Sequence, residues 1–144
     1  MNVIKQEIKE KYAMYCGDSI EIIKGIPDNS IHYSIFSPPF SSLYTYSNSI
    51  RDIGNCKNYN EFGEHFEFLA NELNRVLMPG RLISIHCANI PLMKERDGVI
   101  GIRDFRGDLI RLFQNIGFIF HSEVCIWKDP VVEMQRTKAL GLTG

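Results

Sequence analysis

The chain has 144 residues, 44% of them hydrophobic and 23% charged, and its net charge is −1, from 16 Lys and Arg against 17 Asp and Glu. This is the composition of an ordinary globular domain. It excludes a disordered tail, a collagen-like chain, a coiled coil and a simple basic DNA-binding module. No apolar run reaches the ~18 residues of a membrane span, and residues 1–11 lack the apolar stretch of a signal peptide. We therefore expect one domain, residues 1–144, with a cytoplasmic location and no membrane partner.

Apolar runs of strand length alternate along the chain with amphipathic stretches of helical period. In chain order, the predicted elements are a weakly helical segment (1–11), a buried strand (12–16), a helix (19–26), a strand (31–37), a long loop (41–58), a long amphipathic helix (59–77), a strand (81–87), a second amphipathic helix (104–116), a strand (118–128) and a mildly helical tail after residue 130. Met78-Pro79-Gly80 and Gly117 are expected to stop the two long helices. This alternation predicts βαβ units, a mainly parallel sheet, and helices on both of its faces.

The four cysteines lie far apart and include no C-x-x-C pair, so the sequence does not support a zinc ribbon, and we expect no metal. Three of them fall inside predicted strands, where we expect buried free thiols that act as small hydrophobic side chains. His86 and Cys87 are neighbours in one strand, and because neighbouring strand residues point to opposite faces, they do not suggest a metal site or a nucleophile. The cysteines are Cys16, Cys56, Cys87 and Cys125.

Ser37-Pro38-Pro39-Phe40, directly after a predicted strand, is the most informative tetrapeptide of the chain. Consecutive prolines fix φ near about −65° and remove two backbone donors, so this corner can only accept hydrogen bonds. The Ser37 hydroxyl can accept as well, and Phe40 adds a flat apolar face. Such a site suits an exocyclic amine on a flat heterocycle. If both N–H groups are held, the nitrogen lone pair is directed toward an electrophile without a strong base.

This motif resembles the catalytic motif of the S-adenosylmethionine-dependent DNA amino-methyltransferases, which methylate cytosine N4 or adenine N6. In that family Asp, Asn or Ser precedes Pro-Pro and an aromatic residue. The run from Gly17 to Ser30, the block 72–81 and the segment 126–130 resemble further blocks of the family, so the resemblance covers about residues 12–140. It implies an α/β, Rossmann-like methyltransferase fold, present in part, with a mainly parallel sheet flanked by helices.

The resemblance also implies roles for the residues of the motif. Ser37 and the carbonyl of Pro38 would accept hydrogen bonds from the target amine, and Pro39 would keep the corner rigid. Phe40 would stack on the base after the base flips out of the duplex. Ser-Pro-Pro is commoner among the cytosine-N4 enzymes than among the adenine-N6 enzymes, which favours cytosine. DNA is the implied partner, S-adenosylmethionine the implied cofactor, and restriction–modification one implied context.

Three further residues have two interpretations each. Asp18 ends a predicted strand where the family places an acidic residue near the cofactor, but it also suits the N-cap of the following helix. Tyr44 and Tyr46 could stack on nucleic acid as substrate-binding residues, or could be ordinary aromatic residues of a surface loop. Trp127 is expected to pack against the sheet rather than to contact a base.

The glycine-rich loop with which the family cradles its cofactor is not found, and Gly98 and Gly101 do not replace it because they follow a charged stretch rather than a strand. A target-recognition region is not found either. The motif order matches the permuted members of the family, in which catalysis precedes the cofactor loop. We therefore expect the catalytic segment of a larger protein, with an exposed sheet edge through which the isolated chain self-associates.

Two other interpretations stay open. The chain could be a non-catalytic remnant that keeps the fold and acts in assembly or nucleic-acid binding, which the missing glycine loop favours. It could also be a methyltransferase for RNA or for a protein amide, because related Pro-Pro-aromatic motifs act on planar nitrogens there too. The isolated chain could be inactive, so Ser37→Ala and Phe40→Ala in a complete version of the protein would separate an enzyme from a module, because a module is indifferent to both changes in a methyl-transfer assay.

Overall fold

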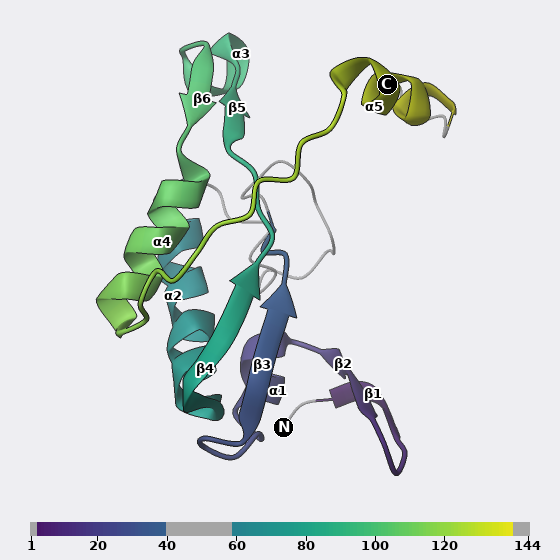
Figure 1. Ribbon diagram of the computed structural model, residues 1–144, viewed down its shortest axis with the longest axis vertical. Coiled ribbons are helices and arrows are strands. Elements are labelled where there is room, and N and C mark those ends of the chain that lie inside the picture. The colour runs from purple at the N-terminus through teal and green to yellow at the C-terminus, as the bar shows by residue number, and fades with distance from the viewer. Residues whose placement is uncertain (1–2, 40–58, 140–144) are drawn as a thin grey trace.

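The computed structural model describes residues 3–39 and 59–139 (Figure 1). Six strands and five helices lie within these ranges. Their bounds are β1 (Val3–Ile8), β2 (Ala13–Gly17), α1 (Ser19–Ile23), β3 (Ile31–Phe36), α2 (Tyr59–Val76), β4 (Leu77–Ile85), β5 (Ile90–Leu92), α3 (Lys94–Asp97), β6 (Gly101–Arg103), α4 (Phe105–Ile116) and α5 (Pro130–Ala139).

The strands form three separate pairs. β3 and β4 are parallel neighbours, and α2 comes between them in the chain, so they make the βαβ unit that the sequence predicts. β1–β2 and β5–β6 are antiparallel hairpins, which extend from opposite ends of the β3–β4 pair (Figure 1). Among the described residues, the parallel arrangement is thus confined to the central pair.

The hydrophobic core lies between helices α1, α2 and α4 and one face of the β3–β4 pair. The helix α2 contributes apolar side chains at steps of three and four residues, which places them on one side of the helix. At the centre Phe66 is completely buried, and its ring lies 5.6 Å from that of Phe62 and 6.2 Å from those of Phe36 and Phe113. The buried core residues are Ile23, Phe62, Phe66, Ala70, Leu73, Val76, Ile90, Phe105, Leu109 and Phe113.

The two faces of the β3–β4 pair have different surroundings. Phe36, Ile83 and Ile85 pack against the helical core. On the opposite face Tyr33, Ile35 and Leu82 are 50%, 69% and 54% exposed. The expectation of helices on both faces is therefore wrong for the described residues, whose core-forming helices gather on one face. We call the helix-covered face the inner face and the other the outer face.

The helix α4 is bounded as the sequence predicts. Asp104 is its N-cap, because its side chain accepts a hydrogen bond of 3.0 Å from the backbone N–H of Gly107. Gly117 ends the helix with a φ of 119°, in the left-handed region that glycine adopts without strain.

The long helix ends one residue earlier than the sequence predicts, and its predicted stop lies inside the next strand. The helix α2 already ends at Val76, and β4 begins at Leu77. Pro79 and Gly80 lie inside β4, where the pairing jumps from Ile31 opposite Leu77 to Tyr33 opposite Leu82. Pro79 and Gly80 thus form an irregularity within the strand. The positive φ of 75° at Gly80 allows the backbone to depart from regular strand geometry there.

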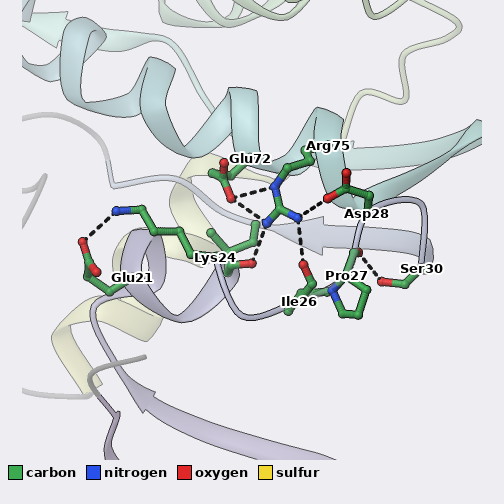
Figure 2. Close-up of polar contacts among 9 residues, drawn as sticks. Glu21, Lys24, Ile26, Pro27, Asp28, Ser30, Glu72 and Arg75 are labelled. Atoms are coloured by element: carbon green, nitrogen blue, oxygen red, sulfur yellow. Dashed lines mark hydrogen bonds and ion pairs between the residues drawn. The ribbon is translucent and has the colours of Figure 1, made fainter.

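Arg75 connects the end of α2 to the chain that leads into β3 (Figure 2). Its guanidinium donates to Glu72 and Asp28, both at 2.6 Å, and to the backbone carbonyls of Ile23 at 3.0 Å and Ile26 at 2.8 Å. Because one planar group satisfies two carboxylates and two carbonyls, it fixes the turn after α1 against α2. The starting point of β3, and with it the strand that carries Ser37, depends on this contact.

Three other predicted elements differ from the structure. Segment 1–11 contains the strand β1 rather than a helix, and every residue of β2 is exposed rather than buried. β1 and β2 pair with each other, so neither faces the core. Segment 118–128 forms no strand in the described chain, because it makes no ladder with a neighbouring strand; Ile119, Val124 and Ile126 are 87%, 86% and 63% exposed.

The exposure of the cysteines follows from these differences in secondary structure. Cys16 and Cys125 are exposed, so the expectation of buried thiols is wrong for both, whereas Cys87 is half-buried against the core. Cys56 lies outside the described residues. No helix in the described ranges combines the length and apolar character needed to cross a membrane.

Candidate functional site

The Ser-Pro-Pro motif begins where β3 ends, at the carboxyl edge of the parallel pair. Ser37 directly follows the last strand residue, Phe36, and is exposed, while Pro38 is buried and Pro39 half-buried. The alternation of the strand continues through the motif, so Pro38 follows Phe36 to the inner face and Ser37 lies on the outer face. Because Pro38 and Pro39 have no N–H, they cannot donate to the ladder, and the strand ends before them.

Ser37 is tied to the neighbouring strand through His86. Its hydroxyl donates to the backbone carbonyl of His86 at 2.9 Å, and its Oγ lies 3.4 Å from Nδ1 of the His86 ring. The register is held by the backbone N–H of His86, which donates to the carbonyl of Phe36 at 3.0 Å. Ser37 and His86 are 49 residues apart in sequence but share one edge of the sheet.

This geometry makes Ser37 a hydrogen-bond acceptor toward other groups. A hydroxyl carries one hydrogen and two acceptor lone pairs, and the hydrogen of Ser37 is used by His86. A group that approaches Ser37 from elsewhere therefore meets lone pairs. Pro38 and Pro39 beside it have no N–H to donate; that this edge binds an amine stays a prediction.

Asp18 is the N-cap of α1, as one of its two interpretations predicts. Its carboxylate accepts a hydrogen bond of 3.0 Å from the backbone N–H of Ile20. It directly follows β2, which belongs to the N-terminal hairpin and not to the β3–β4 pair. The described residues contain no glycine-rich turn between a strand and a helix, so of the two features that the family resemblance assigns to the cofactor, only the acidic residue is present in them.

The aromatic residues of the expected site lie mostly outside the described ranges. This holds for Phe40, Tyr44 and Tyr46, whose roles stay predictions. Trp127 is described, and the expectation that it packs against the sheet is wrong because its side chain is 78% exposed. It belongs to the extended segment between α4 and α5, which crosses the view of Figure 1 beside β4.

Charged side chains gather just beyond the end of β4. Arg106, at the start of α4, forms an ion pair with Glu123 of the extended segment, and its backbone N–H donates to Asn89 Oδ1 at 3.2 Å. The pKa of the Cys87 thiol is raised, chiefly by burial; Arg106 lowers it and Glu123 raises it further. In the described chain no group of three or more His, Cys, Asp or Glu side chains could hold a metal ion.

His86 is the neighbour of Ser37 that sequence reasoning missed. The argument that His86 and Cys87 face opposite ways is confirmed, since His86 is exposed and Cys87 packs against the core. The same alternation contains the signal for His86, because carboxyl ends of neighbouring parallel strands meet at one edge. An outward residue at the end of 81–87 is thereby placed beside an outward residue at the end of 31–37.

Comparison with known proteins identifies one sequence relative and one fold. Over 120 residues the chain is 30% identical to the type II methyltransferase M.PvuII from Proteus hauseri; the match covers 82% of this chain and 32% of that protein. The chain thus spans about a third of the length of this curated relative. No family model matches the chain.

Solved structures of TTHA0409 from Thermus thermophilus, described as a DNA modification methylase, share the fold. One aligns with a TM-score of 0.55 at 18% identity, over 78% of this chain and 46% of that chain. The form complexed with S-adenosyl-L-methionine aligns with a TM-score of 0.56 at 21% identity, over 78% of this chain and 47% of that chain. The sequence match and the shared fold together confirm the resemblance: this chain is a relative of the DNA amino-methyltransferases and carries part of their Rossmann-like fold.

Proposed function

We propose that this chain carries the amine-binding site of a DNA methyltransferase that moves a methyl group from S-adenosylmethionine to the exocyclic amine of a base. The observation that supports this most is the hydrogen bond of 2.9 Å from the Ser37 hydroxyl to the His86 carbonyl, which leaves the serine oxygen as an acceptor beside two prolines. The relationship to M.PvuII and the solved complex of TTHA0409 with S-adenosyl-L-methionine support the choice of reaction and cofactor.

The chemistry assigned to the residues is positioning. The target base flips out of the duplex, because an amine inside a base pair cannot reach the site. Ser37 Oγ and the Pro38 carbonyl accept its two N–H groups, which withdraws the nitrogen lone pair from the ring and directs it outward. Phe40 is assigned to stacking on the base, and Tyr44 and Tyr46 to contacts with DNA. S-adenosylmethionine supplies an electrophilic methyl group.

Cytosine N4 is the favoured target because the motif begins with serine. In the cytosine enzymes that the motif resembles, Ser-Pro-Pro is the commoner form. Asp18 is assigned to the cofactor side of the site in addition to its capping of α1. The match covers 32% of M.PvuII. We assign completion of the cofactor site and reading of the recognition sequence to residues that correspond to the rest of that protein.

The test is transfer of a labelled methyl group to DNA, followed by nucleoside analysis for N4-methylcytosine and N6-methyladenine. Ser37→Ala is expected to lower kcat by about 10²–10³-fold, the cost typical of losing one preorganised hydrogen-bonding group at a reacting centre. Ser84→Ala is the matched control, because Ser84 accepts from the Tyr33 hydroxyl at 2.7 Å on the same pair of strands but away from the edge. Methyl transfer that survives Ser37→Ala and Phe40→Ala contradicts the proposal.

Calorimetric titration with S-adenosylmethionine separates the two halves of the proposal. Binding by the folded chain supports a usable cofactor pocket without a glycine-rich loop. Loss of that binding in Asp18→Asn, with α1 intact, supports the assignment of Asp18. A folded chain that does not bind the cofactor is the catalytic part only, and other residues then supply the cofactor site.

We further propose that the isolated chain self-associates through the β3–β4 pair. Among the described residues each of these strands pairs on one side only, and Ile35 and Leu82 on the outer face are 69% and 54% exposed. Unpaired strand edges and exposed apolar side chains both favour association. Light scattering after size exclusion is expected to give a mass above 16.6 kDa, and a clean monomer contradicts the proposal.

A further inference from the structure

The His86 side chain has no role in the mechanism above, yet it stands beside the serine that the mechanism depends on. We propose that His86 is a positioning residue, whose imidazole holds the Ser37 hydroxyl hydrogen on the β4 side of the site. The inference rests on the proposed function and deepens it, because it explains how a serine is kept as an acceptor.

Two groups of one residue bracket the serine oxygen. The carbonyl oxygen of His86 accepts at 2.9 Å, and Nδ1 of its ring lies 3.4 Å from Ser37 Oγ. A neutral imidazole has one nitrogen that accepts and one that donates. With the hydrogen on Nε2, both the carbonyl oxygen and Nδ1 of His86 can accept the hydroxyl hydrogen of Ser37. The ring contact is at the long end of hydrogen-bond distances, so it is the weaker and adjustable partner.

The direction of this hydrogen decides what Ser37 can bind. A serine hydroxyl rotates about its C–O bond and can present either its hydrogen or its lone pairs to a ligand. If the hydrogen turned toward an amine, two donors would face each other and the amine would lose one of its two acceptors. With a second acceptor at His86, the hydroxyl keeps its hydrogen directed to β4 even while a ligand disturbs the site.

The fold holds the two residues in this relation. The bond of 3.0 Å from the His86 N–H to the Phe36 carbonyl fixes the last step of the parallel ladder. Pro38 and Pro39, which follow Ser37, have no N–H with which to extend the pairing. On the outer face the neighbouring cross-strand pair, Tyr33 and Ser84, is also hydrogen-bonded, at 2.7 Å. This second pair offers a control of the same type, earlier on each strand.

The first test is independent of activity. Long-range proton–nitrogen NMR of the histidine rings near neutral pH reports which nitrogen of His86 carries the hydrogen. We expect Nδ1 of His86 to be the bare nitrogen and its shift to move in Ser37→Ala. The nitrogen shifts of His32, His65 and His121 serve as internal references and are expected not to change in Ser37→Ala. An unchanged His86 ring in Ser37→Ala overturns the proposal.

The second test is the methyl-transfer reaction itself. His86→Ala is expected to lower kcat by roughly 3- to 10-fold with little change in KM for DNA, which is the worth of one neutral hydrogen bond. His86→Asn, which restores an acceptor close to the position of Nδ1, is expected to recover most of the rate, and Tyr33→Phe to behave like wild type. Wild-type kcat in His86→Ala, or equal loss in Tyr33→Phe, overturns the proposal.

The two tests fail in different ways. The isolated chain is expected to be inactive if other residues complete the cofactor site, so the rate is measured in a complete protein that contains this chain. A complete protein that transfers no methyl group overturns the proposed function, and with it the catalytic value of the pair. The NMR comparison then still decides whether the imidazole holds the Ser37 hydroxyl. Because Ser37 and His86 are both outside the helical core, these substitutions leave that core untouched, and thermal melting of each variant verifies that it is folded.

Discussion

The inner and outer faces of the β3–β4 pair carry different properties of the protein. The inner face packs Phe36 and Ile85 against helices whose centre is the buried ring of Phe66. The outer face carries exposed apolar side chains and two hydrogen-bonded polar pairs. The last pair, Ser37 with His86, lies at the carboxyl edge, which is where open α/β sheets generally bind ligands. Because side chains alternate along a strand, the same residues of backbone support the fold on one side and present chemistry on the other.

The strongest way to separate the faces is to truncate one large side chain on each. Phe66→Ala removes a completely buried ring that contacts three other rings, and we expect a loss of about 3–5 kcal/mol in the free energy of unfolding. Ile35→Thr on the outer face is expected to change it by no more than about 0.5 kcal/mol, because Ile35 is 69% exposed. Urea unfolding measures both. Similar losses would show that the outer face is covered in solution.

A second prediction concerns the contact that fixes the start of β3. Arg75→Met removes hydrogen bonds to Glu72 and Asp28 and leaves the carbonyls of Ile23 and Ile26 without their charged donor. We expect a drop in Tm smaller than that of Phe66→Ala but larger than that of any exposed ion pair. Lys24→Met is the control, because it removes only the exposed pair with Glu21 at 3.0 Å. Equal Tm values for the two variants would refute the structural role of Arg75.

A third prediction compares two helical glycines. A Cβ at Gly107 would collide with Asp104 Oδ2, so Gly107→Ala displaces the capping carboxylate, at a cost of about 1 kcal/mol. At Gly63, in α2, a Cβ meets nothing within 4 Å. Gly63→Ala is therefore expected to stabilise the protein by about 0.5–1 kcal/mol. Gly107→Ala gains the same helix propensity but loses the cap, so urea unfolding is expected to show it less stable than Gly63→Ala by about 1 kcal/mol. Equal stabilities would contradict the capping of α4 by Asp104.

The smallest expected effect tests the burial of the Cys87 thiol, which lies just beyond the carboxyl end of β4. Burial raises the pKa of the Cys87 thiol, so at a given mildly alkaline pH less of it is the reactive thiolate. In a Cys56→Ser background we expect Cys16 and Cys125, both exposed, to react with a disulfide reagent before Cys87. The difference in reaction rate between the two exposed cysteines and Cys87 should become smaller as the pH rises and Cys87 ionises. Peptide mass spectrometry identifies each thiol, and three equal rates would place Cys87 on the surface.

The parts of the fold that depend on local sequence could be predicted. The helix α2 follows from its apolar steps from Phe62 to Val76, and α4 from Asp104 and Gly117 at its ends. β3 and its end before Pro38 and Pro39 follow in the same way. In each case the side chains that define the element lie within a few turns of each other along the chain.

The parts that depend on distant partners could not. A strand needs a neighbour to pair with, and the apolar run 118–128 does not reveal whether one is available. In the described chain this segment pairs with no strand. β1 was missed because its charged residues pair with an equally exposed β2. His86 was missed for the same reason, since its contact with Ser37 spans 49 residues and depends on the register of two strands.

Trp127 gives this molecule an optical reporter. It is the single tryptophan of the chain, and its indole is 78% exposed on the extended segment that the Arg106–Glu123 ion pair ties to α4. Its fluorescence therefore starts from the spectrum of indole in water, and any molecule that settles over this segment shifts the emission to shorter wavelength. DNA, a second copy of the chain or another protein can each be titrated against this signal without a label.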